Sequence, residues 1–260
     1  MRKYFLLALF VIVYTIAFAQ RNGYDCYPPN WWTGMKWNKV QVMIHGDAIA
    51  NAMYGFDIKY PGVKLVKTNK VENSNYVFLD LEISPNAKPG MIKIQVKKQA
   101  ETFDIPFELK QRRKGKGTSY AQGVTSKDLI YLIMPDRFSN GDPSNDRVPG
   151  MRDQSLNRDT VFNRHGGDLK GVENHLDYLR SLGVTAIWLN PVIENDMPER
   201  TEHGYAFTNH YKIDPRLGGE KAYQQLIDAA HAKGFKMIQD AVYNHVGLYH
   251  FTVQDPPMKE

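Results

Sequence analysis

The sequence predicts a multidomain protein in which an all-β sandwich is followed by an α/β domain with parallel strands. Short runs that alternate apolar and polar residues fill residues 25–110, and continuous apolar runs alternate with helical patterns over residues 128–260. Alternation with period 2 is typical of strands with one buried face, whereas parallel strands covered on both faces are apolar throughout. The polar, glycine-bearing stretch at 111–127 indicates the linker between the two domains.

Residues 1–19 have the pattern of a cleavable signal peptide. Arg2 and Lys3 precede an apolar run over residues 5–18, and the small residues of A-F-A at 17–19 suit a cleavage site. An uncleaved anchor is the alternative. We expect a secreted, periplasmic protein without membrane contact after cleavage. Cys26 is the single cysteine, so the chain has no internal disulfide.

Three tryptophans, Trp31, Trp32 and Trp37, precede the first strongly alternating run. Their flat faces could stack on sugar rings, or they could pack a domain seam, and the sequence leaves both roles open.

Alternating runs predict the strands of the sandwich, and turn-forming residues separate them. The four runs are Val40–Ile44, Tyr76–Ile83, Met91–Val96 and Phe103–Leu109. Strands at this spacing favour a sandwich. Pro106 lies inside the last run and cannot donate a ladder hydrogen bond, so we expect that strand at a sheet edge.

The charge of the chain is moderately basic. It has 33 Lys and Arg against 28 Asp and Glu, a formal net charge of +5. The densest basic run, Arg112-Arg113-Lys114 with Lys116, lies among glycines in the predicted linker. We interpret this run as solvated, and we expect no nucleic-acid partner.

The second domain alternates strands and helices. Its predicted elements are the strands Leu129–Met134, Val184–Leu189 and Phe235–Ile238, and the helices Leu169–Leu182 and Glu220–Lys233, each followed by glycine. The strands are apolar throughout, so we expect both of their faces to be buried. Such units form parallel sheets, and active sites in parallel barrels lie at the carboxyl ends of the strands.

Polar residues follow two of these strands at that end. Phe235–Ile238 runs directly into Asp240 and His245, which would point a carboxylate and an imidazole at a ligand. His203-Gly204-Tyr205 follows the second strand. Tyr205 could offer its face to a sugar ring, or it could be a buried tyrosine bonded to a neighbour.

The loop Phe138–Asp146 is rich in oxygen ligands, and His165-Gly166-Gly167-Asp168 follows later. Calcium takes about six to eight oxygens from carboxylates, amides and carbonyls. The loop could therefore wrap a calcium ion, or its Asn and Asp side chains could cap their own turns.

These motifs, in this order, resemble the α-amylase family of glycoside hydrolases. They read YLIMPDRFSNGDPSND, GGDL, GVTAIWLNP, HGYAFTNHYKIDP and DAVYNH. The likeness is greatest to the neopullulanase, cyclomaltodextrinase and maltogenic amylase branch, whose N-terminal domain the PNWWTGM segment and the short-stranded region also resemble. The resemblance implies an immunoglobulin-like sandwich and the first part, about three βα units, of a TIM (β/α)8 barrel.

The resemblance also implies roles for single residues. Asp240 and His245 would hold the sugar before the scissile bond, Tyr205 would stack beneath it, and His203 would join this substrate-binding group. The implied Ca²⁺ ligands are Asn140, Asp142, Asn145, Asp146, Gly166 through its carbonyl, and Asp168.

In this family of retaining glycosidases the catalytic carboxylates follow the fourth, fifth and seventh barrel strands, so we expect them beyond Glu260. A retaining enzyme needs two carboxyl groups about 5 Å apart. Asp240 is not the nucleophile by position. We therefore expect an N-terminal fragment that is inactive by itself.

Three functions stay open. The first is hydrolysis, by a longer periplasmic enzyme, of α-1,4-glucosidic bonds in maltodextrins, cyclodextrins or pullulan. The second is non-catalytic binding of α-glucan oligosaccharides. The third is glycosyl transfer as the main reaction of the full-length enzyme. Relatives in this branch often dimerise through the sandwich, which implies a homodimer.

Overall fold

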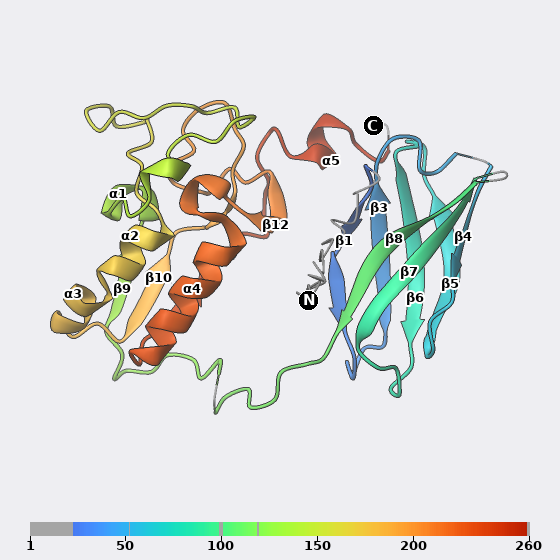
Figure 1. The fold of residues 1–260 in the computed structure, drawn as a ribbon, viewed down its shortest axis with the longest axis horizontal. Helices are drawn as coiled ribbons and strands as arrows, with labels where there is room; N and C mark the ends of the chain where they lie inside the picture. The colour runs from blue at the N-terminus through green and yellow to red at the C-terminus, as the bar shows by residue number, and fades with distance from the viewer. Residues whose placement is uncertain (1–22, 52, 99–100, 119, 259–260) are drawn as a thin grey trace, which may run out of the picture.

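The structure is a computed structural model, and it describes residues 23–51, 53–98, 101–118 and 120–258 (Figure 1). A β-sandwich forms the N-terminal part, and a small parallel sheet with helices forms the C-terminal part. The predicted signal peptide, residues 1–19, lies outside the described residues. Within the described ranges, no helix is both long enough and apolar enough to cross a membrane.

Two four-stranded sheets form the sandwich. One has the order β1 (Asp25–Tyr27), β3 (Lys39–His45), β6 (Tyr76–Ile83), β5 (Val63–Lys70), and the other has β2 (Asn30–Trp32), β8 (Glu101–Lys110), β7 (Gly90–Lys98), β4 (Tyr54–Ile58). Alternate residues of these strands point inward, and Val42, Ile44, Leu79, Ile94 and Phe107 are fully buried between the sheets. The alternating pattern therefore marks one inward face on each sheet, as predicted.

The prediction of an edge position for the strand that contains Pro106 is wrong. β8 lies between β2 and β7. Its parallel pairing with β2 covers only Glu108–Lys110, and Pro106 precedes this stretch. The ring of Pro106 therefore removes no hydrogen bond to β2, which explains why a proline is tolerated in a strand with neighbours on both sides.

The C-terminal part is built on three parallel strands in the order β13 (Lys236–Gln239), β10 (Ala186–Leu189), β9 (Ile130–Ile133). Figure 1 shows its longer helices lying over one face of this sheet. The helices are α1 (Pro135–Phe138), α2 (Leu169–Asn174), α3 (Leu176–Ser181), α4 (Gly219–Ala232) and α5 (Phe251–Gln254). Short 3-10 turns lie at Pro143–Asn145 and Pro215–Leu217, and β11 (Ile193–Glu194) pairs with β12 (Asn209–Ile213).

The helix predicted over Leu169–Leu182 is two helices that meet at His175. In a continuous α-helix the backbone N–H of His175 would donate to the carbonyl of Gly171. Instead the Nδ1 atom of the His175 ring bonds that carbonyl at 2.8 Å, and the backbone N–H bonds Val172 at 3.1 Å. The side chain thus replaces the backbone at the break.

The opposite face of the parallel sheet is open in the described part of the chain. Ile130 and Leu132 are 43% and 55% exposed, and Trp188, which lies opposite Leu132 in the register, is 38% exposed. The prediction that these strands are buried on both faces is therefore wrong, because helices cover only one face. β13 ends the strand order of the sheet within the described residues.

A buried ion pair fixes the loops above the sheet. Arg216 is fully buried, and its Nε and Nη2 donate to the carboxylate of Asp214 at 3.0 and 2.8 Å. It also donates to the carbonyls of Asp153 and Asn195 at 3.1 and 2.7 Å. Burial alone would raise the pKa of Asp214, but the hydrogen bonds and charge of Arg216 outweigh burial and lower it. One guanidinium therefore ties three separate segments together.

We expect Asp214→Ala to lower the free energy of unfolding by about 3–5 kcal/mol, because the Arg216 charge would stay buried without its partner. The matched control is Asp104→Ala, whose ion pair with Lys93 spans 3.3 Å between side chains that are 38% and 75% exposed. This control should lose at most about 1 kcal/mol. Chemical denaturation followed by circular dichroism measures both. A similar loss in the two variants would contradict the importance of the buried pair.

Candidate functional site

The predicted sugar-contacting residues meet at the carboxyl ends of β10 and β13. Asp240 directly follows β13, and Tyr205 lies in the long connection between β10 and β12. The Tyr205 hydroxyl donates to Oδ2 of Asp240 at 2.9 Å, and the indole Nε1 of Trp188 donates to the same oxygen at 3.2 Å. Two aromatic side chains therefore orient one carboxylate.

A second set of bonds fixes the loop that carries Tyr205. Its backbone N–H donates to Nδ1 of His203 at 2.9 Å, and its carbonyl bonds Nε2 of His245 at 2.9 Å. The rings of His203 and Tyr205 are stacked with centroids 5.9 Å apart. The structure thus brings together all four residues that the sequence analysis assigned to sugar binding.

The protonation states follow from these contacts. Burial, followed by the hydrogen bond to Asp240, raises the pKa of Tyr205, so its hydroxyl stays a donor at neutral pH. Burial lowers the pKa of His203, which favours the neutral ring. A carbonyl can only accept, so Nε2 of His245 carries a proton, and Nδ1 is the nitrogen left for a ligand. That nitrogen donates to a sugar hydroxyl only when the ring is protonated, and it accepts when the ring is neutral.

Trp188 is the residue of this site that sequence reasoning missed. It lies in the apolar run that forms β10, and the run was interpreted as strand core. A single indole near the carboxyl end of an otherwise aliphatic strand was the available signal, because its N–H needs a partner. Asp240 is that partner.

The loop after His245 is held against the Tyr205 loop by a close backbone contact. The N–H of Gly247 donates to the carbonyl of Phe207 at 2.8 Å. A Cβ atom at position 247 would lie 2.3 Å from the carbonyl oxygen of Ala206. Glycine therefore permits the approach that fixes the position of His245, two residues earlier.

The oxygen-rich loop folds onto the start of α2. Oδ1 of Asp168 accepts from the N–H groups of Gly141 and Gly171 at 3.1 and 2.6 Å, and Oδ2 accepts from the N–H of Asp142 at 2.8 Å. A Cβ at Gly141 would lie 2.4 Å from the nitrogen of Gly171. Asp168 thus caps α2 and holds the loop at the same time.

Four further ligand candidates lie in this cluster. Nδ2 of Asn140 donates to Oδ1 of Asp146 at 2.7 Å, and Nδ2 of Asn145 donates to Oδ2 of Asp168 at 3.3 Å. Gly166 packs so closely that a Cβ there would lie 2.7 Å from Oδ1 of Asp146. The structure therefore brings the segments around residues 140–146 and 166–168 together.

Two amide oxygens in the cluster, Oδ1 of Asn140 and Oδ1 of Asn145, are buried without a hydrogen-bond partner among the described residues. A buried oxygen without a partner is costly, and amide oxygens beside carboxylates are the ligands that calcium prefers. No three His, Cys, Asp or Glu side chains in the described ranges form a metal cluster. The donor set therefore fits an oxygen-liganded cation only if the amides take part.

Asp142 is placed differently from the other predicted ligands. Its Oδ1 accepts from the backbone N–H and the hydroxyl of Ser144 at 3.0 and 2.6 Å. These two bonds lower the pKa of Asp142. The Asp142 side chain caps a turn, which is the alternative that the sequence analysis left open for this loop. Its backbone N–H donates to Asp168.

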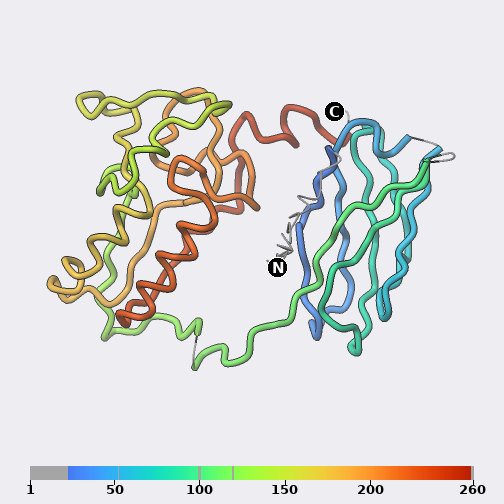
Figure 2. The backbone as a smooth tube through the Cα atoms, viewed as in Figure 1, coloured from blue at the N-terminus to red at the C-terminus, as the bar shows by residue number. Residues whose placement is uncertain are grey.

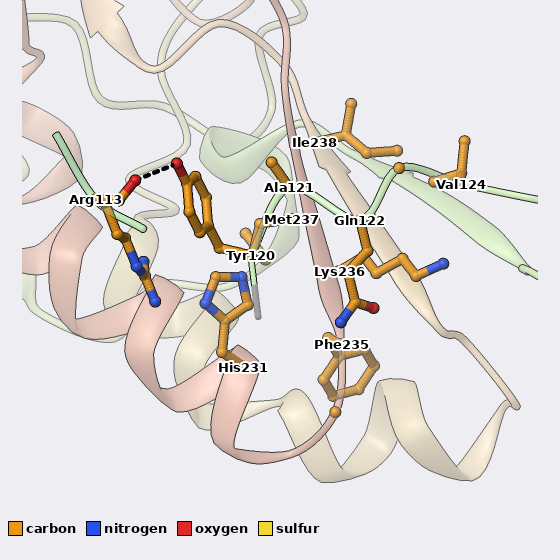
Figure 3. Close-up of a pocket in the computed structure, with 12 residues that line it drawn as sticks. Arg113, Tyr120, Ala121, Gln122, Val124, His231, Phe235, Lys236, Met237 and Ile238 are labelled. Atoms are coloured by element: carbon orange, nitrogen blue, oxygen red, sulfur yellow. Dashed lines mark hydrogen bonds between the residues drawn. The ribbon is translucent and has the colours of Figure 1, made fainter. Parts of the chain in front are cut away.

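A separate cavity of about 330 Å³ lies beside the beginning of β13 (Figure 3). Arg113 and Tyr120 of the predicted linker, His231 of α4 and Lys236 line it. The Arg113 guanidinium lies 4.7 Å from the centre of the Tyr120 ring. Lys236 is the first residue of β13 and Asp240 follows the last, so this cavity is not part of the candidate site.

Two family models match the chain in succession. Residues 26–113 match the N-terminal domain of cyclomaltodextrinase, and residues 132–257 match the catalytic domain of alpha-amylase. Residues 132–257 belong to the α-amylase family. The resemblance and the fold class inferred from the motifs are thereby confirmed.

Relatives of this chain carry the names that the motifs suggested. Neopullulanase 2 of Thermoactinomyces vulgaris is 41% identical over 131 residues, which cover 49% of this chain and 21% of the relative. Cyclomaltodextrinase of Thermoanaerobacter pseudethanolicus is 38% identical over 140 residues, covering 54% and 23%. A solved Anoxybacillus alpha-amylase is 38% identical and covers 50% of this chain and 27% of its own, with a TM-score of 0.43. The matches span 10% to 23% of the curated relatives' lengths.

Gly247→Ala should lower the free energy of unfolding by about 1–3 kcal/mol, because the new methyl group would overlap the Ala206 carbonyl. Gly55→Ala is the matched control, since its Cβ would meet only Lys97 at 4.0 Å. Denaturant titration compares the two variants. Equal stability of Gly247→Ala and the parent would show that the two loops do not approach as described.

Proposed function

We propose that this chain supplies part of the substrate site of a secreted enzyme that hydrolyses α-1,4-glucosidic bonds in maltodextrins, cyclodextrins or pullulan. The observation that carries the proposal is the Asp240 carboxylate, oriented by Tyr205 and Trp188 at the carboxyl end of β13, with His245 on the adjoining loop. The α-glucan hydrolases among the relatives, neopullulanase and cyclomaltodextrinase, support this substrate class.

The proposed binding mode uses the two kinds of surface on a glucose ring. The apolar ring face would lie against the Tyr205 ring, and the hydroxyl edge would meet Asp240 and His245. Both aromatic donors bind Oδ2 of Asp240, which leaves Oδ1, within the described residues, to accept from a sugar hydroxyl. A charged acceptor makes a stronger bond than a neutral one, so Asp240 would dominate recognition.

We also propose that Ca²⁺ binds the oxygen-rich loop. Asn140, Asn145, Asp146, Asp168 and the carbonyl of Gly166 would hold it, and Asp142 would join after turning from Ser144. The ion would supply no reacting group. It would neutralise the carboxylates and tie the loop at 138–146 to the start of α2.

Secretion to the periplasm is part of the proposal. It rests on the signal-like residues 1–19 and on the periplasmic alpha-amylase of Escherichia coli, which is 37% identical over 129 residues, covering 45% of this chain and 19% of the relative.

Binding of α-glucan without cleavage is the second candidate function. Trp31 packs against the sandwich core, whereas Trp37 is 70% exposed and offers a flat face to a sugar. Product analysis of the full-length protein on maltotriose separates the reactions. Glucose and maltose indicate hydrolysis, longer oligosaccharides indicate transfer, and unchanged maltotriose indicates binding alone.

Maltotriose should bind the 260-residue chain, and Asp240→Asn should raise the dissociation constant at least about tenfold, since a hydrogen bond to a charged group contributes about 1.5–3 kcal/mol. Asp228→Asn, on the exposed face of α4, should leave the constant unchanged. Isothermal titration calorimetry measures all three proteins. Equal affinity of Asp240→Asn and the parent would remove Asp240 from the site.

Removal of calcium by a chelator should lower the melting temperature by roughly 5 °C, because an ion at a hundred times its dissociation constant adds about 2.7 kcal/mol. Asp146→Ala should abolish this response, and Asp159→Ala, an exposed carboxylate in a neighbouring loop, should retain it. Differential scanning calorimetry with and without the chelator provides the comparison. A parent protein insensitive to the chelator would contradict the calcium proposal.

A further inference from the structure

The segment from Gly247 to Pro257 connects the candidate site to the sandwich (Figure 2). It starts where Gly247 bonds Phe207, beside the Tyr205 loop. It continues through α5, which Figure 1 shows between β12 and the sandwich strands. It ends against the turn that precedes β6. One short segment therefore touches both parts of the molecule.

Both carboxylate oxygens of Asp255 are bound by the sandwich. Oδ1 accepts from Nδ2 of Asn73 at 2.6 Å, and Oδ2 accepts from Nδ2 of Asn75 at 3.0 Å. Nε2 of His45 lies 3.1 Å from the same Oδ2. Burial alone would raise the pKa of Asp255, but the hydrogen bonds from Asn75, His45 and Asn73 outweigh burial and lower it. Asp255 is therefore ionised at neutral pH, which strengthens each of these bonds.

The backbone around Asp255 is held as well. The hydroxyl of Tyr76 donates to the carbonyl of Asp255 at 2.5 Å, and the N–H of Asn73 donates to the carbonyl of Pro257 at 3.1 Å. Tyr76 is fully buried, so its hydroxyl has a fixed position. The sandwich therefore specifies the orientation of the segment and not only its proximity.

Aromatic packing completes the junction. The Phe251 ring stacks on Tyr27 and His45, with centroids 4.7 and 5.0 Å away. His250 is buried beside it, and burial, followed by the nearby His210, lowers the pKa of His250 to about 4. The His250 ring is therefore neutral at pH 7 and can stack on Phe251 at 4.6 Å without placing a charge in the junction.

The covalent connection between the two parts, which also lines the cavity beside β13, has no regular secondary structure of its own in the described part of the chain. Residues 111–127 contain no helix or strand within their described positions. A connection without regular structure constrains orientation less than specific side-chain contacts do. The contacts around Asp255 fix the orientation, and the chain carries that constraint directly into the loop that bears His245.

We propose that Asp255 is a positioning residue of the sugar site. The hydrogen bonds from the sandwich fix the position of Asp255, and they thereby hold the His245–Gly247 loop against the Tyr205 loop. Among the described residues, the sandwich contributes no side chain to the site formed by Asp240, Tyr205 and His245. It would nevertheless influence the affinity of this site for sugar. The inference rests on the proposed sugar-binding function for one of its two readouts.

The test compares Asp255→Ala and Tyr76→Phe with the parent 260-residue chain. Tyr76→Phe removes only the hydroxyl that binds Asp255 and is remote from the sugar site. The control is Tyr60→Phe, which removes a hydroxyl bond of 3.0 Å to Lys88 inside the sandwich. The first readout is the dissociation constant for maltotriose. The second is hydrogen exchange at the Gly247 amide, which lies outside the sandwich.

Both junction variants should raise the dissociation constant roughly three- to thirtyfold and speed exchange of the Gly247 amide, while Tyr60→Phe changes neither. The double variant should raise the dissociation constant at least as far as the stronger single variant. Asp255→Ala removes the carboxylate bonds, and Tyr76→Phe removes the separate bond to the Asp255 backbone carbonyl. Parent-like affinity together with parent-like Gly247 exchange in both variants would overturn the proposal. If Asp255→Ala fails to fold, the dissociation constant and the Gly247 exchange rate of Tyr76→Phe decide whether the proposal stands. If the parent itself binds no maltotriose, the proposed function fails, and the exchange readout still decides the role of Asp255.

Discussion

The register between β10 and β13 is the constraint on which the site depends. Trp188 lies opposite Ile238, and Leu189 lies opposite Gln239. Side chains alternate along a strand, so Asp240 follows Ile238 on the same face and comes next to Trp188. A shift of one residue would move Asp240 to the helix-covered face. The indole–carboxylate bond at 3.2 Å and the Tyr205 bond at 2.9 Å both follow from this alignment.

The loops above the sheet are held mainly by charged side chains that bind backbone groups. Arg216 donates to carbonyls of two segments, and Asp168 accepts from three backbone N–H groups. The carboxylate of Asp255 accepts hydrogen bonds from amide side chains of the sandwich. Irregular loops leave backbone groups without ladder partners, so buried charges can satisfy several of them at once. Each of these residues therefore stabilises a connection that apolar packing alone would leave unspecified, and the proposed sugar-contacting residues lie on or beside those connections.

The periodicity of the sequence predicted the long elements. It failed where contacts with distant segments determine the secondary structure. β6 has the predicted bounds, Tyr76–Ile83, because its inward side chains alternate without interruption. β1 and β2 are too short to show a pattern, and the lysine-rich β5 carries a bulge. The helix break at His175 depends on one side-chain bond. The bond between Asp255 and Asn73 joins residues 182 positions apart, so no local pattern could indicate it. The family motifs named the candidate sugar-binding residues but gave no role to Trp188.

The central claim is that Asp240, Tyr205 and His245 form one sugar-binding surface at the end of β13. A crystal structure of the chain with bound maltotriose tests it most directly. The account predicts a glucose ring against the Tyr205 face, with a hydroxyl in hydrogen-bonding distance of Oδ1 of Asp240. Maltotriose bound only on the sandwich, for example at Trp37, with no sugar contact to Asp240, would contradict the account.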